Sequence, residues 1–361
     1  MGYENHQITI DGMTNRICII GHFGFGYNLL NGQTIKTHII ANELEMQMKD
    51  IVLSKIDTHN FKNKLLLLPR SFYALIKNDN IIILPAHNAL LIEVPWLILW
   101  NYIFNRNLHY VVIGGWLVTF IEKHLFVKSL LRRFNGIYVE TDSMKKALDK
   151  NGFNNVNVLP NCKPLKILKE EELVNCFSEP YQLVTFSRVM EQKGIEDAVR
   201  SVKIANERIG HNAFKLTIYG QIEHGQESWF ANLQKQFNDF IIYGGFVDYD
   251  KSTDVLRESY ALLFPTFYEG EGFAGTILDA FASGLPVIAS DWKYNSQIVE
   301  HLKTGCIFPV RDVDMLASII VFIYNHQSEW VAMKYNCLRE AFKYTPQLAL
   351  RPLLKALKYV S

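Results

Sequence analysis

Residues 265–291, PTFYEGEGFAGTILDAFASGLPVIASD, contain the pattern that decides the fold. The apolar run YALLF (260–264) precedes them and predicts a buried strand, a glycine-dense turn follows over residues 270–275, and a helix is expected from about Thr276. The apolar run PVIA (286–289) predicts the next strand. Strand, turn, helix and strand in this order are typical of a parallel α/β sheet, because a helix must carry the chain back between parallel strands.

The same alternation extends over the whole chain and divides it into two halves. The first half begins with a strand at residues 16–21 and a glycine-rich loop over 21–32, and the second begins with QLVTF (182–186), after a polar stretch typical of a linker. We therefore predict two Rossmann-like, doubly wound α/β domains that face a cleft, residues 1–165 and 166–345. A C-terminal helix within residues 346–361 is expected to pack back on the first domain.

The composition is that of a globular protein without a disulfide framework. Of the 361 residues, 49% are hydrophobic and 20% are charged, which excludes a disordered or fibrous chain. The five cysteines are scattered and form no Cys-x-x-Cys pair, which favours reduced thiols in the cytoplasm over disulfides or a zinc site. The start is polar, and the most apolar stretch, residues 81–100, is interrupted by polar residues and prolines, so that we expect no signal peptide or spanning helix.

The charge is uneven along a nearly neutral chain. Residues 1–165 contain 17 Lys and Arg against 12 Asp and Glu, whereas the remainder contains 20 against 24. The basic half also places aromatic residues close to cations. They are Trp96, Trp100, Tyr102, Phe104, Trp116, Phe120 and Phe126, with Lys123, Lys128, Arg132 and Arg133. This pattern predicts peripheral contact with the inner face of the cytoplasmic membrane, although an aromatic core beside a solvated basic helix is the alternative. The near-neutral total and the lack of a binding motif argue against a nucleic-acid partner.

Two groups of residues near strand ends are candidates for phosphate chemistry. A helix that begins after Gly275 would present free N–H groups to an anion. Glu271 lies in the turn before this helix, and Asp279, eight residues later, lies about one turn inside it. In FSRVMEQKG (186–194), Arg188 and Lys193 follow the first strand of the second half, where two cations would suit a diphosphate. Each feature alone is also compatible with an ordinary surface loop.

Together these segments resemble the GT-B family of retaining glycosyltransferases usually called family 4. The residues that carry the resemblance are Arg188 and Lys193 with their spacing, the Glu271-Gly272-Phe273 turn with a second acid at Asp279, and GLPVIA (284–289). GGFV (244–247) is similar to the loop whose backbone contacts the nucleotide base in that family. NGQ (31–33) is similar to its glycine loop that closes over the donor, and the likeness is most specific between residues 188 and 312.

The resemblance implies a retaining hexosyltransferase (EC 2.4) that moves a sugar from a nucleotide-sugar, by family habit a UDP-sugar, to a saccharide or lipid-linked acceptor in polysaccharide or glycoconjugate biosynthesis. No cofactor and no metal are expected. Catalytic roles are implied for Arg188, Lys193 and Glu271. The implied donor-binding residues are Gly32, Gly244, Phe246, Val247, Gly272, Phe273, Ala274, Gly275, Thr276 and Asp279.

Departures from the family pattern leave other interpretations open. Asp279 stands where Glu is usual, Ala274 stands where Gly is common, and IGGW (113–116) lacks the histidine that many members place there. His87 and Trp116 are therefore the candidates on the acceptor side. The alternatives are a non-catalytic GT-B partner or chaperone subunit, and a nucleotide-sugar epimerase or phosphorylase of the same fold.

Overall fold

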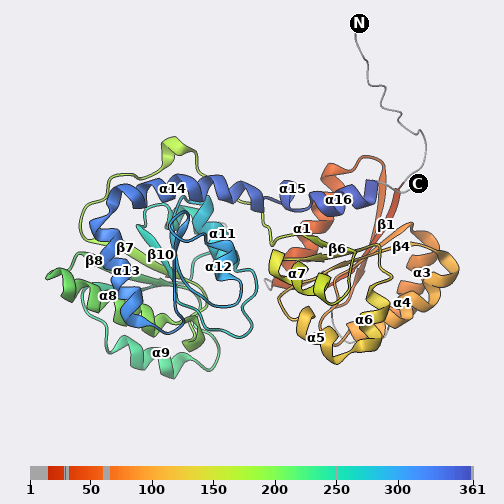
Figure 1. The fold of residues 1–361 in the computed structure, drawn as a ribbon, viewed down its shortest axis with the longest axis horizontal. Helices are drawn as coiled ribbons and strands as arrows, with labels where there is room; N and C mark the ends of the chain where they lie inside the picture. Colours follow the sequence, from red (N-terminus) through yellow and green to blue (C-terminus); the bar gives the residue numbers. More distant parts are fainter. Residues whose placement is uncertain (1–14, 28, 30–31, 60–65, 249–250, 359–361) are drawn as a thin grey trace, which may run out of the picture. The chain divides into compact units, whose positions relative to one another are not determined.

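The computed structural model describes residues 15–27, 29, 32–59, 66–248 and 251–358, which belong to two compact units. The first unit comprises residues 1–159 and 350–361, and the second comprises residues 160–349. Each unit is built on its own six-stranded sheet and is described separately (Figure 1). In the part of the chain that is described, no helix combines the length and the apolar character needed to cross a membrane.

The first unit contains a parallel sheet in the order β2-β1-β3-β4-β5-β6. Its strands are β1 (Asn15–Gly21), β2 (Ile51–Asp57), β3 (Asn80–Ile83), β4 (Asn107–Val111), β5 (Gly136–Val139) and β6 (Val156–Val158). Its helices are α1 (Gly32–Gln47), α3 (Leu67–Lys77), α4 (Leu90–Phe104), α5 (Leu117–Lys123), α6 (Leu125–Leu131), α7 (Asp142–Lys150) and α16 (Arg351–Lys358). The strand order reverses between β1 and β3, where Ile17 pairs with Asn80.

The second unit contains a parallel sheet in the order β12-β11-β10-β7-β8-β9. Its strands are β7 (Tyr181–Phe186), β8 (Phe214–Tyr219), β9 (Ile241–Gly245), β10 (Ala261–Phe264), β11 (Val287–Ser290) and β12 (Gly305–Phe308). Its α-helices are α8 (Ile195–Ile209), α9 (Glu227–Gln234), α10 (Ser252–Leu256), α11 (Gly275–Ala282), α12 (Asn295–Ile298), α13 (Val313–Asn325), α14 (Gln327–Ala341) and α15 (Pro346–Ala349). Short 3₁₀ turns occupy Glu170–Glu172, Glu191–Lys193 and Phe342–Tyr344. The strand order reverses between β7 and β10.

The sequence explains why these segments form buried parallel strands. The central strands β3 and β10 are apolar or uncharged throughout and fully buried, as expected when helices cover both faces of a sheet. The α8 helix has one apolar face, and Gly194 and Gly210 flank it with φ angles of 69° and 92°, which a glycine adopts without strain. The predicted doubly wound α/β architecture is confirmed in both units.

The C-terminal segment differs from the single helix that was expected. The structure divides it into α15 and α16, with Leu350 between them. Pro352 lies in the first turn of α16, where its missing N–H costs little, but it cannot donate to a carbonyl of the preceding turn and so interrupts a continuous helix.

Candidate active site

The loops at the carboxyl ends of β7 and β10 flank the point at which the second sheet reverses its strand order. Ligands of such sheets bind at this point, outside the carboxyl ends of the strands. The β7 loop contains Arg188 and Lys193, and the β10 loop contains Glu271. Topology therefore brings the three predicted catalytic residues to one edge of the sheet.

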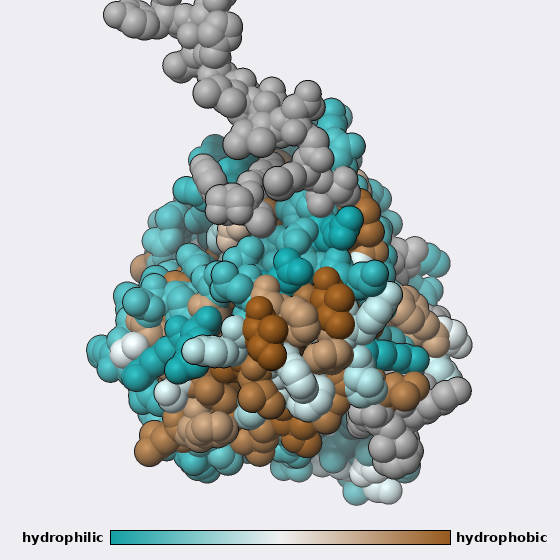
Figure 2. Space-filling model, turned by 90° about the vertical axis from the view of Figure 1, so that its right-hand side faces the viewer, coloured by the Kyte–Doolittle hydropathy of each residue, from teal (hydrophilic) through white to brown (hydrophobic). Residues whose placement is uncertain are grey.

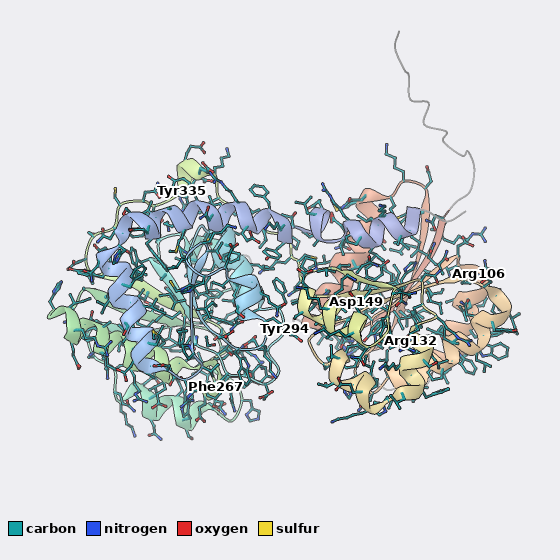
Figure 3. All side chains as sticks on the ribbon, in the orientation of Figure 1. Arg106, Arg132, Asp149, Phe267, Tyr294 and Tyr335 are labelled. Carbon is teal, nitrogen blue, oxygen red and sulfur yellow. The ribbon has the colours of Figure 1, made fainter. Side chains whose placement is uncertain are left out.

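Direct contacts hold the two loops together. The N–H of Phe267 donates to the carbonyl oxygen of Gln192 at 2.8 Å. The Phe267 ring, labelled in Figure 3, also contacts the loop after β12, where the guanidinium of Arg311 lies 4.4 Å from it. Gly194 packs so tightly that a Cβ there would overlap the carbonyl oxygen of Pro265. The two loops are thus a single packed unit, and residue 194 has no room for a side chain.

Lys193 and Glu271 form a largely buried ion pair. The Lys193 Nζ lies 2.6 Å from Glu271 Oε2, and each side chain is only 9% exposed. The Thr266 hydroxyl donates to the same carboxylate oxygen at 2.8 Å. The carboxylate is therefore fixed in position by a cation and a hydroxyl group, as a ligand-binding group must be.

Arg188 is more exposed and forms a different ion pair. Its Nη1 lies 2.7 Å from Glu223 Oε2, and the two side chains are 49% and 35% exposed. The Tyr268 ring lies 5.5 Å from the Arg188 guanidinium and 5.2 Å from the Lys193 ammonium. The two predicted cations therefore flank one aromatic ring. Glu223 was not predicted from the sequence, because it stands outside the motif segments. Tyr268 was not singled out either, although it lies within residues 265–291.

The α11 helix begins directly after the β10 loop, and no side chain caps its N-terminus. The Thr276 hydroxyl instead donates to the carbonyl oxygen of Phe186 at the end of β7, which ties the helix start to the strand that precedes Arg188. Of the preceding residues, Gly272 is half-buried, whereas Phe273 and Ala274 are buried. The first-turn N–H groups of α11 and its positive dipole end are suited to an anion.

Asp279 lies inside α11 and is buried. Lys163 Nζ contacts its Oδ1 at 2.7 Å. Burial raises the pKa of Asp279, and the ion pair with Lys163 offsets part of that effect. Both acidic residues of the predicted motif, Glu271 and Asp279, are thus paired with lysines, and the sequence analysis did not single out Lys163.

The end of β9 presents backbone and one exposed ring. A Cβ on Gly244 would overlap the ring of Tyr219, so that the backbone there stays bare. Phe246 is 61% exposed and Val247 is half-buried. The Tyr243 hydroxyl donates to the carbonyl oxygen of Gly220 at 2.8 Å and links β9 to the loop after β8.

In the first unit the two acceptor-side candidates lie in contact. The His87 and Trp116 rings are 4.6 Å apart, and His87 is also 4.8 Å from Phe120. The Trp116 Nε1 donates to the carbonyl oxygen of Ile113 at 2.8 Å. Gly32 is the first residue of α1, whereas Asn31 of the predicted glycine loop lies outside the described residues.

Two further polar clusters support the loops of the first unit. Asp57, at the end of β2, accepts hydrogen bonds from the N–H groups of Phe23, Gly24 and Phe25 in the loop after β1. Burial alone would raise the pKa of Asp57, but these donors and the N–H of His59 together hold it below its ordinary value. An aspartate that binds a loop in this way keeps the loop in one conformation.

The second cluster is a buried ion pair beneath the Trp116 loop. Lys36 Nζ in α1 lies 2.6 Å from Glu140 Oε1, and the side chains are 2% and 5% exposed. The other Glu140 oxygen accepts the N–H of Gly114 at 3.2 Å. The pair thus joins α1 to the loop that precedes Trp116. No local pattern of residues predicts this pair, because the partners lie 104 positions apart.

Part of the second unit matches a known protein family. Residues 180–326 match the family "Glycosyl transferases group 1". The amylovoran biosynthesis glycosyltransferase AmsK of Erwinia amylovora is 24% identical over 164 residues, which cover 44% of this chain and 40% of that protein. The match therefore spans less than half the length of that relative.

Two solved structures share the whole fold. Sucrose-phosphate synthase from Thermosynechococcus elongatus has a TM-score of 0.71 at 17% identity, over 96% of this chain and 100% of that one. HepE from Anabaena, solved in complex with UDP, has a TM-score of 0.71 at 13% identity, with the same two shares. The resemblance to GT-B glycosyltransferases is confirmed, and the fold is GT-B.

Proposed function

From a GT-B fold in which residues 180–326 match the glycosyl transferases group 1 family, we propose that this chain transfers a sugar from a UDP-sugar to a saccharide acceptor, with retention of the anomeric configuration. The observation that carries the proposal is the placing of Arg188 and Lys193 at one sheet edge, beside the uncapped N-terminus of α11. Two cations and free N–H groups in one place are the requirements of a departing diphosphate.

The donor would lie along the carboxyl edge of the second sheet. Arg188, Lys193 and the N–H groups of Gly275 and Thr276 would bind the diphosphate. Glu271, held by Lys193, would accept hydrogen bonds from hydroxyl groups of the transferred sugar.

The nucleoside would lie towards β9 and α11. The bare backbone from Gly244 to Val247 would contact the base, with the exposed Phe246 ring beside it. Asp279 and Lys163 would reach the ribose, and the lysine would compensate for the shorter acidic side chain.

The chemical step would be attack on the front face of the sugar. The acceptor hydroxyl oxygen forms a bond to the anomeric carbon as the bond from that carbon to the phosphate oxygen breaks, and the departing phosphate takes the hydroxyl proton. The developing charge on the phosphate is stabilised by Arg188, Lys193 and the α11 N-terminus, without a metal ion. Catalysis then depends mainly on charge and positioning.

We further propose a lipid-linked saccharide acceptor, in cell-surface polysaccharide or glycoconjugate biosynthesis at the inner face of the cytoplasmic membrane. The adjacent rings of His87 and Trp116 form a surface that suits a sugar ring. AmsK is named as a glycosyltransferase of amylovoran biosynthesis, which supports a biosynthetic transferase role.

Thermal denaturation with UDP, GDP, ADP and CMP tests the donor. We expect UDP alone to raise the melting temperature, because a ligand at about 100 times its Kd adds about 2.7 kcal/mol, or a few degrees for a chain of this size. Arg188→Ala should abolish most of the shift, whereas Arg208→Ala, a control on α8 whose side chain pairs with Asp314, should retain it. No shift with any nucleotide would contradict the proposal and favour a non-catalytic role.

Glu223 forms an ion pair with Arg188 and therefore competes with the diphosphate for this cation. Removing the charge of Glu223 should strengthen the binding of UDP. Glu223→Gln is expected to lower the Kd for UDP by up to about fivefold, because a half-exposed ion pair is worth up to about 1 kcal/mol. Isothermal titration measures this, with Glu227→Gln on α9 as the control. Weaker binding in Glu223→Gln would mean that Glu223 itself contacts the ligand.

A further inference from the structure

The α4 helix exposes an apolar stripe to solvent. Ile92, Leu99, Tyr102 and Ile103 are 61%, 62%, 87% and 68% exposed, and their spacing places them on one side of the helix. The opposite side is buried, and the only charged residue of α4, Glu93, is buried with it. A helix that is apolar on all sides is ordinarily enclosed on all sides, so that the exposed stripe requires an occupant.

Helices that pack against α4 expose further apolar side chains. The α3 and α6 helices both pack against α4. The exposed apolar residues that they add are Tyr73 and Ile76 from α3 and Leu125 and Phe126 from α6. Figure 2 shows apolar residues gathered on this side of the first unit. Apolar faces of this kind mark sites of interaction with a protein or a membrane.

The tryptophans of this region do not contribute to the exposed face. Trp96 and Trp100 are half-buried and pack against each other, and Phe72 of α3 packs on Trp100. The Trp96 Nε1 donates to the carbonyl oxygen of Leu68. Trp96 and Trp100 therefore join α4 to α3, whereas Tyr102 and Phe126 are exposed.

The helices around α4 contain more basic than acidic residues. The helices α3, α5 and α6 and the two residues after α6 contain six basic residues and a single acidic residue, Glu122. The basic residues are Arg70, Lys77, Lys123, Lys128, Arg132 and Arg133. A second copy of the same face would bring cations against cations, because a two-fold interface pairs a surface with itself. Anionic lipid headgroups supply the opposite charge, and acyl chains accept the stripe.

We propose that α3, α4 and α6 dock the first unit on an anionic bilayer, with the α4 stripe inserted at the level of the headgroups. This inference rests on the proposed function in one respect: a lipid-linked acceptor is located in the membrane, so that the enzyme must reach the membrane surface to act on it. The contacts that carry it are independent of the donor site.

Flotation with liposomes tests the proposal on the full chain. The wild-type protein is expected to float with phosphatidylcholine vesicles that contain about one third phosphatidylglycerol, and not with phosphatidylcholine alone. Leu99→Asp/Ile103→Asp should lower the partition coefficient by about a hundredfold, since two large apolar side chains lose their burial. Lys123→Gln/Arg133→Gln should lower it by about fivefold for each charge. Met315→Asp/Phe342→Asp, at exposed apolar positions of the second unit, should leave it unchanged.

The readouts separate this proposal from the proposed function. The Leu99→Asp/Ile103→Asp variant should keep the UDP-induced thermal shift. It should also keep its rate of sugar transfer to a soluble saccharide acceptor, because both residues lie in α4 of the first unit, whereas the proposed donor site lies in the second unit. Failure of the wild-type protein to float at low salt would overturn docking alone. Flotation of the variant like the wild type, or a dimer in sedimentation that the same substitutions dissociate, would also overturn it.

Discussion

Replacing Lys193 by alanine is expected to lower kcat/KM for sugar transfer by about ten- to a hundredfold. A charge-assisted contact to the departing diphosphate is worth about 1.5–3 kcal/mol, and its loss raises the barrier by that amount. The variant also leaves Glu271 without its cation in a site where both side chains are 9% exposed. We therefore expect a second effect, a fall in the free energy of unfolding of about 3–5 kcal/mol in the second unit.

Two companion variants separate the two effects. Lys193→Ala/Glu271→Gln removes both charges and should recover much of the stability but not the activity. Lys203→Ala, on the adjacent α8 helix, removes a cation that binds the carbonyl oxygen of Gln236 and should change neither. Initial rates of UDP release and urea unfolding give the two quantities. A Lys193→Ala enzyme with wild-type kcat/KM would exclude a role for Lys193 in leaving-group stabilisation.

The sequence predicts the sheets well because local signals determine them. The runs NIII (80–83) and ALLF (261–264) are short, apolar and bounded by turn residues, and both become buried central strands. The same locality makes the start of α11 predictable, since glycines and a preceding strand mark it. The end of the chain is less predictable. Its residues have a strong helical pattern, but Pro352 interrupts the helix at the preceding turn and divides it into α15 and α16.

Only some residues of the candidate site can be predicted from the sequence. Arg188, Lys193 and Glu271 stand in recognisable segments, but their partners do not. Glu223 contacts Arg188 only because β7 and β8 end side by side in the sheet. Lys163 contacts Asp279 across 116 positions. Such pairs depend on topology, and no local pattern of residue types encodes them.

Lys36 is the clearest case, because in the sequence it looks like a surface residue of a helix. The structure buries it against Glu140 beneath the loop of Gly114. Lys36→Met is expected to destabilise the first unit by about 3–5 kcal/mol, since a buried carboxylate is left without its cation. Hydrogen exchange of peptides from β4 and β5 at increasing urea concentration measures the loss, and Lys55→Met, whose partner Glu45 is 47% exposed, is the control.

The double variant Lys36→Met/Glu140→Leu tests whether this ion pair serves only folding or also positions the Trp116 loop for acceptor binding. Apolar side chains of similar size should restore most of the stability, because a buried ion pair is seldom more stabilising than a well-packed apolar pair. The Gly114 N–H would still lose its acceptor, and Trp116 lies two residues further on. We therefore expect the KM for the acceptor to rise severalfold while the Kd for UDP is unchanged. An unchanged acceptor KM in a stable double variant would limit Lys36 and Glu140 to folding and remove the Trp116 loop from acceptor binding.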